Sequence, residues 1–140
     1  MAERWVRQCI VGYDECGSIG SKPIGQNVFF HPKPILTHWE ALALSTWFSE
    51  KDTLSNNLSI GSLHPEGVSN YTQLVWARTQ FVGCGAASMY GGHLIVCYYY
   101  PKGNNVGEKV FTVGRRACTG CPHERASCSH VFRGLCGIGK

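Results

Sequence analysis

Two stretches decide the fold of this chain: residues 68–86, VSNYTQLVWARTQFVGCGA, and residues 94–104, LIVCYYYPKGN. Their pattern predicts a helix over Tyr71–Thr79, followed by two strands, Phe81–Ser88 and His93–Tyr100, that flank a turn around residues 90–92. Both faces of the second strand are apolar between residues 94 and 98, which is typical of a central strand covered on both sides. The two stretches therefore predict a hairpin at the centre of a layered domain.

Each strand of this hairpin carries one cysteine, Cys84 or Cys97. Opposed residues of an antiparallel hairpin share a constant index sum, so a four-residue loop over Met89–Gly92 places Cys84 opposite Cys97, whereas a two-residue loop over Gly91–Gly92 does not. Opposed residues at a non-hydrogen-bonded site lie about 4.5 Å apart at Cα, near the lower edge of the disulfide range. We therefore expect a bridge here; two free core thiols are the alternative.

The rest of the chain predicts helices around a small sheet. A capping box at Thr37–Glu40 indicates the start of an amphipathic helix. The other expected elements are the end of a helix in Ala2–Cys16, a strand at Gln26–Phe30, a surface loop at Asp52–Pro65 and an edge strand at Val110–Val113. Helices on both faces of a small antiparallel sheet define an α+β fold, a three-layer α-β-α sandwich.

Composition narrows the classes of function. The chain has 140 residues and a net charge of +4, with scattered basic residues and no apolar run of the roughly 18 residues that a membrane span needs. We therefore expect neither a nucleic-acid groove nor a membrane span. Eight cysteines favour a disulfide framework and an oxidising compartment. The first residues, MAERWVRQC, lack the apolar core of a signal peptide, so we expect an upstream segment to be missing.

The opening motifs resemble the two signature blocks of the CAP superfamily, which comprises cysteine-rich secretory proteins, insect venom allergens and plant pathogenesis-related proteins. The first block of the family reads roughly His-Tyr-Thr-Gln-x-Val-Trp followed by Val-Gly-Cys-Gly, and the second reads x-Val-Cys-x-Tyr-x-Pro-x-Gly-Asn. The resemblance implies the same sandwich, a CAP (SCP) domain over residues 1–114 without the family's first helix, and a cysteine-rich tail over residues 115–140. It also implies that Cys84 and Cys97 are bridged.

The resemblance points to a cavity where many family members gather two histidines and two acids that can hold a divalent metal. In this chain the four positions fall on Tyr13, Gln26, Glu50 and Asn70, so one ligand of four survives. Tyrosine, glutamine and asparagine are poor zinc ligands beside imidazole and carboxylate. We therefore expect a hydrogen-bonded polar cluster, with no metal and no other cofactor.

The remaining cysteines and one asparagine carry further expectations. In the tail, Cys118, Cys121, Cys128 and Cys136 are expected to form two disulfides of undetermined pairing; a zinc knuckle built on Cys118 and Cys121 is the alternative. Cys9 and Cys16 match cysteines that bond an N-terminal extension in the venom-allergen branch, so we expect free or mispaired thiols and dimers. Asn57 begins an Asn-x-Ser acceptor for glycosylation.

The resemblance implies a secreted, non-enzymatic protein of the insect venom-allergen-like branch. Its expected partners are a small hydrophobic ligand, sterol-like or eicosanoid-like, or an extracellular protein. Two other classes stay open: a non-functional truncated product and a metal-dependent hydrolase. The hydrolase would need the four metal ligands that this chain has largely lost. Nucleophilic catalysis is not supported either, because no Ser/His/Asp or Cys/His set has a supporting spacing.

Overall fold

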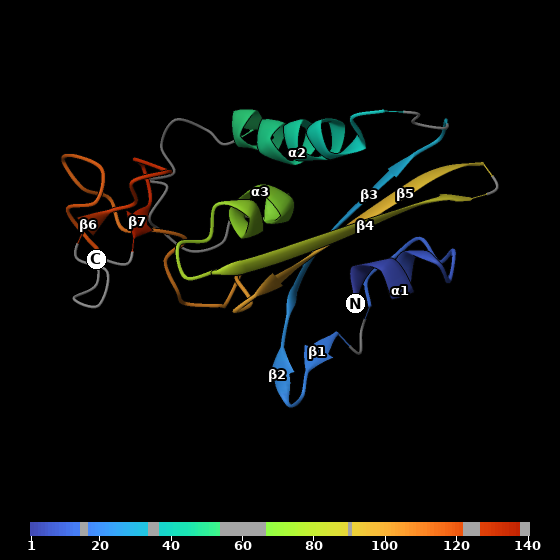
Figure 1. The fold of residues 1–140 in the computed structure, drawn as a ribbon, viewed down its shortest axis with the longest axis horizontal. Coiled ribbons are helices and arrows are strands. Elements are labelled where there is room, and N and C mark those ends of the chain that lie inside the picture. The colour runs from blue at the N-terminus through green and yellow to red at the C-terminus, as the bar shows by residue number, and fades with distance from the viewer. Residues whose placement is uncertain (15–16, 34–36, 54–66, 90, 122–126, 138–140) are drawn as a thin grey trace.

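A three-stranded antiparallel sheet forms the centre of the computed structural model, which describes residues 1–14, 17–33, 37–53, 67–89, 91–121 and 127–137 (Figure 1). Its strands are β3 (Gly25–His31), β4 (Phe81–Met89) and β5 (Gly92–Tyr100), in the order β3-β5-β4. The hairpin strands and the strand near residue 26 are thus where the pattern predicts them. β5 is central, as its two apolar faces indicate.

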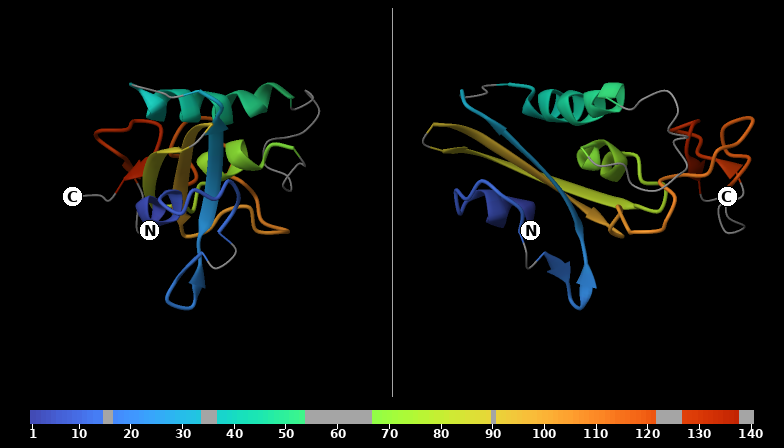
Figure 2. Two further views of the ribbon diagram at one scale, coloured as in Figure 1. Left: turned by 90° about the vertical axis from the view of Figure 1, so that its right-hand side faces the viewer. Right: turned by 180° about the vertical axis from the view of Figure 1, so that it is seen from behind.

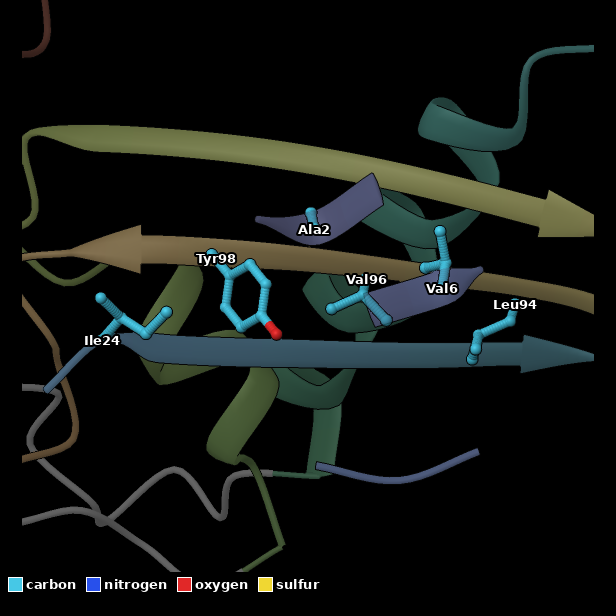
Figure 3. Packing of buried hydrophobic residues seen from close by; sticks show 6 residues of the cluster. All are labelled: Ala2, Val6, Ile24, Leu94, Val96 and Tyr98. Carbon is cyan, nitrogen blue, oxygen red and sulfur yellow. The ribbon is translucent and has the colours of Figure 1, made fainter. Parts of the chain in front are cut away.

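The two faces of β5 belong to two separate hydrophobic clusters. Leu94, Val96 and Tyr98 pack with Ala2 and Val6 of α1 (Ala2–Val6), as Figure 3 shows. On the opposite face, Ile95, Cys97 and Tyr99 pack with Ala43 and Trp47 of α2 (Trp39–Ser49). Alternate residues of one strand therefore supply both cores.

The helices cover both faces of the sheet and complete the predicted α-β-α sandwich (Figure 2). α1 lies on one face, while α2 and α3 (Ser69–Leu74) lie on the other. A 3₁₀ turn, η1 (Glu50–Thr53), extends α2 toward α3. The outer side of α2 leaves Leu42, Leu44 and Phe48 between 36% and 46% exposed.

The helices differ from the predicted ones in extent. α1 ends at Val6 and does not reach Cys16, because the chain turns through hydrogen-bonded steps to Cys9, whose φ of 56° is left-handed. α3 covers Ser69–Leu74 and not Tyr71–Thr79. Beyond it the backbone bonds elsewhere: the Ala77 N–H donates to the Val110 carbonyl at 2.9 Å.

Three other local predictions were wrong. α2 has His38 at its N-cap with a φ of 55° and no side-chain cap, so the capping box of Thr37 and Glu40 does not form. Val110–Val113 is not a strand. Val110 is buried, and its carbonyl accepts a hydrogen bond from the Ala77 backbone N–H, just beyond α3. The hairpin loop is also shorter than predicted, since Met89 pairs with Gly92. That pair has the same index sum as the predicted four-residue loop, so the register is unchanged.

Two small ribbons complete the described elements. β1 (Ser18–Ile19) pairs with β2 (Lys22–Pro23) ahead of β3, and β6 (Ser127–Cys128) pairs with β7 (Cys136–Gly137) in the tail. Figure 1 places the β6–β7 ribbon at one end of the long axis and the β1–β2 ribbon below the sheet. The cysteine-rich tail is therefore an appendage beside the sandwich.

Candidate functional site

Glu50 and Asn70 are the two candidate cavity residues that the structure brings into contact. The Asn70 Nδ2 donates to Glu50 Oε1 at 2.7 Å, and the Tyr71 backbone N–H donates to Glu50 Oε2 at 2.9 Å. Glu50 begins η1 and Asn70 lies in the first turn of α3, so the carboxylate joins the two helical elements. Both of its oxygens are occupied by donors of the protein itself.

Gln26 belongs to the opposite face of the sheet. It pairs with Tyr98 across β5, on the α1 side, whereas its neighbour Asn27 pairs with Cys97 on the α2 side. The Gln26 Oε1 accepts the Asp14 backbone N–H at 2.8 Å, and Tyr98 donates to Asp14 Oδ2 at 2.8 Å. Gln26 thus takes part in a different polar group from Glu50.

Tyr13 completes the four candidate positions, and it is 57% exposed. The four residues are therefore divided among a helix junction, the α1 face and the surface. Within the described part of the chain, no group of three or more His, Cys, Asp or Glu side chains could hold a metal ion. The residues present do not fit the divalent metal that the fold family implies, because no imidazole is among them and one carboxylate is left.

Asn27 is the polar residue at the interior of this region that sequence reasoning missed. It is fully buried, and its Nδ2 donates to the Asn70 carbonyl at 3.0 Å and to the Tyr99 hydroxyl at 3.2 Å. Burial raises the pKa of Tyr99, and the hydrogen bond from Asn27 opposes that rise. The available signal was a polar residue directly before the apolar run Val28–Phe30 of the predicted strand.

A pocket of about 540 Å³ lies between α1 and the end of the sheet. Most of its walls are apolar or aromatic: Ile19, Ile24, Phe81, Val82, Tyr98 and Tyr100. Glu3 and Arg4 add charge at its α1 side. The pKa of Tyr98 is raised mainly by burial, and also by its hydrogen bond to Asp14 and the negative charge of that carboxylate. Its hydroxyl donates to the Asp14 carboxylate at 2.8 Å.

The structure also brings together one serine and one histidine, Ser88 and His93. Ser88 Oγ and His93 Nδ1 are 3.1 Å apart across the β4–β5 hairpin. His93 Nε2 is buried without a partner, so no hydrogen-bonded acid orients the ring through that atom. This pair lacks the third group of a hydrolytic triad.

Three disulfides join the six cysteines of the hairpin and the tail. Cys84 and Cys97 are bridged in the predicted register, with Cα atoms 4.0 Å apart. The tail bridges are Cys118–Cys128 and Cys121–Cys136, a pairing that the sequence left open. Because the four tail cysteines are in disulfides, their sulfurs are not thiolates that could bind zinc. Cys9 is exposed and free, while Cys16 and Asn57 lie outside the described residues.

These features define a disulfide-stabilised α-β-α domain with a cysteine-rich tail, and comparisons with known proteins identify its class. The model of the cysteine-rich secretory protein (CAP) family matches residues 1–99, and the chain belongs to this family. Venom allergen 5 of Dolichovespula arenaria is 30% identical over 124 residues, covering 79% of this chain and 57% of that protein. Salivary antigen-5 of Dipetalogaster maximus is 32% identical over 122 residues, covering 79% of this chain and 47% of that protein. The chain thus spans about half the length of these relatives.

Solved structures agree on the fold. A structure described as NaASP2 with Zn²⁺ superposes with a TM-score of 0.75 at 24% identity, covering 97% of this chain and 70% of that one. BmVAL-1 superposes with a TM-score of 0.68 at 25% identity, covering 96% and 70%. These likenesses establish the CAP sandwich. In the described residues, no helix combines the length and apolarity of a membrane span.

Proposed function

We propose that this protein is a secreted, non-enzymatic CAP-domain protein that binds a small hydrophobic ligand in the pocket beside α1. The observation that carries the proposal is the pocket itself: its volume of about 540 Å³ is in the range of small-molecule sites, and its walls are largely apolar. Ile24 and Tyr98 form its buried floor, at 8% exposed each, whereas Phe81 and Val82 line its mouth at 64%.

The charged groups of the pocket favour an amphipathic ligand over a plain hydrocarbon. Arg4 and Glu3 line the pocket at its α1 side. An eicosanoid-like carboxylate would find a cation in Arg4, and a sterol-like hydroxyl would find polar partners at the rim. Burial of the ligand's apolar body would supply most of the affinity.

The non-enzymatic reading rests on the division of the candidate cavity. Glu50 is occupied by Asn70 and Tyr71, and Gln26 belongs to the other sheet face. Proteins of this family are in general not classical enzymes. A secreted location is supported by the three disulfides and by the venom and salivary relatives.

A substitution that fills the pocket tests whether the ligand binds there. Gly83 lines it, and a Cβ at this position would meet nothing within 4 Å. Gly83→Leu should therefore fill the pocket without disturbing the strand, and should weaken binding of a fluorescent fatty acid and of cholesterol at least tenfold. Gly12→Leu is the matched control, because a Cβ there also has open space and Gly12 lies outside the pocket. Equal affinities for the wild type and Gly83→Leu, or no binding of either lipid, would refute the proposal.

A further inference from the structure

The net charge of this protein is concentrated in its tail. Residues 115–140 contain five basic and one acidic residue, whereas residues 1–114 contain eight of each, so the whole formal charge of +4 belongs to the tail. Arg115, Arg116 and Arg133 are all exposed. Within the described residues, none of these three arginines forms an ion pair. The tail therefore presents unneutralised positive charge beside a neutral domain.

The same tail exposes its large apolar side chains at one turn. Val131, Phe132 and Leu135 follow β6 and are 79%, 64% and 62% exposed. We call these three residues and Arg133 between them the tail tip. Three large apolar side chains exposed within residues 131–135 are typical of an interaction site.

Hydrogen bonds hold the turn that presents the tail tip. The Ser129 Oγ accepts the N–H groups of Val131 at 3.2 Å and Phe132 at 3.1 Å. The Leu135 N–H donates to the Phe132 carbonyl at 2.8 Å, and the Ser129 N–H donates to the Leu135 carbonyl at 2.7 Å. These bonds close the turn and leave its apolar side chains outward.

Two disulfides hold the strands behind the turn. Cys128 of β6 lies opposite Cys136 of β7, and each is bridged back to the preceding segment, to Cys118 and Cys121 respectively. Cys118 Sγ lies 3.6 Å from the Leu135 carbonyl oxygen, so the segment that follows Arg115 and Arg116 packs against the tail tip. A surface restrained in this way loses little conformational entropy when it binds.

Position in the molecule makes the tail tip accessible. The β6–β7 ribbon lies at one end of the long axis, away from the β3-β5-β4 sheet and from α1 (Figures 1 and 2). It is also separate from the pocket, none of whose lining residues comes from the tail.

We propose that the tail tip is a membrane-surface site that inserts Val131, Phe132 and Leu135 among the headgroups of an anionic phospholipid bilayer while the arginines contact lipid phosphates. These apolar side chains are 62–79% exposed around one hydrogen-bonded turn with arginine beside them, a combination that suits a deformable, anionic lipid interface. Cations beside an apolar tip complement an anionic leaflet. Contact of this kind is peripheral and reversible.

Vesicle co-sedimentation of the full chain tests this proposal. The protein should bind phosphatidylcholine vesicles that contain about 30% phosphatidylserine, an anionic lipid of the kind that attracts basic segments, and should bind pure phosphatidylcholine at least tenfold more weakly. Binding should fall when salt is raised from about 0.1 M to about 1 M, because the Debye length falls from about 10 to about 3 Å. The double variant Val131→Ser/Phe132→Ser should lose at least tenfold in binding.

The chain offers a matched control for that variant. Val106→Ser/Val113→Ser removes two large apolar side chains that are 96% and 72% exposed, outside both the tail tip and the pocket, and should bind vesicles as the wild type does. Arg133→Gln should lower binding to anionic vesicles alone. Non-reducing peptide mapping of each variant checks that the disulfides are intact.

Three results would overturn the proposal. The first is absence of binding to anionic vesicles, and the second is an equal loss of binding in the two double variants. The third is salt-sensitive binding to soluble poly-glutamate without binding to vesicles, which would indicate an acidic protein as the partner of the tail.

Discussion

At the scale of single residues, Glu50 is the one acid among the four candidate cavity positions, and hydrogen-bond donors of the protein itself occupy it. Its two carboxylate oxygens accept hydrogen bonds from Asn70 and from the Tyr71 backbone, at the junction of η1 and α3. A carboxylate that satisfies two donors in a half-buried site stabilises the packing of these elements. Charge-assisted bonds of this kind are stronger than bonds between neutral groups.

We expect Glu50→Ala to lower the free energy of unfolding by about 2 kcal/mol, because two donors lose their acceptor. Urea unfolding followed by circular dichroism measures this. The control is Glu40→Ala, an exposed acid in the first turn of α2, which should cost about 0.5 kcal/mol through the helix dipole.

The same samples, stripped with chelator and replenished with zinc, should hold far less than one zinc per chain. A stoichiometric zinc that disappears in Glu50→Ala would contradict this interpretation.

At the scale of elements, the contact between α1 and β4 depends on a single missing side chain. Gly85 lies on the α1 face of β4, opposite Val96. A Cβ on Gly85 would lie 2.7 Å from the Glu3 backbone nitrogen and 2.9 Å from the Ala2 backbone carbon. The helix backbone therefore rests directly on the strand. This close approach holds α1 over the sheet and shapes the adjoining pocket.

Gly85→Ala should displace α1 and lower the free energy of unfolding by about 1–3 kcal/mol, the usual cost of overpacking. Gly83→Ala, two residues earlier on the same face of β4, should cost nothing, since its Cβ meets no atom within 4 Å. Denaturant midpoints of the two variants give the comparison. Equal midpoints would show that α1 is not seated on Gly85.

At the scale of the whole molecule, Cys9 gives the protein a route to association. Its thiol is exposed and free, and it lies just beyond the C-terminus of α1. α1 ends at Val6, so Cys9 lies outside the helix. An exposed thiol in an oxidising compartment is open to pairing between molecules.

We therefore expect oxidised preparations to contain disulfide-linked dimers that reducing agent converts to monomers. Cys9→Ser should be monomeric under the same conditions. Size-exclusion chromatography with thiol counting is the measurement. An internal Cys9–Cys16 disulfide found by peptide mapping, in a monomeric wild type, would show this expectation to be wrong.

The sequence by itself determined the central part of the fold, for a local physical reason. Strand periodicity is a property of neighbouring residues, so the two apolar faces of residues 94–98 identified β5 as central, and the index sum placed Cys84 opposite Cys97. Element ends were less predictable. The capping box at Thr37 failed because His38 adopts a left-handed conformation, and α3 stopped at Leu74 because later backbone groups bond to the Val110 segment.

Only the tertiary structure decided how the candidate site is arranged. On β3 a shift of one residue separates Gln26, on the α1 face, from Asn27, on the α2 face, and no local pattern told which of them would share a cluster with Glu50 and Asn70. The pocket beside α1 likewise gathers residues 1–4, 19, 24, 81–84 and 98–100. Such a site is set by contacts between segments far apart in the chain, which sequence spacing does not encode.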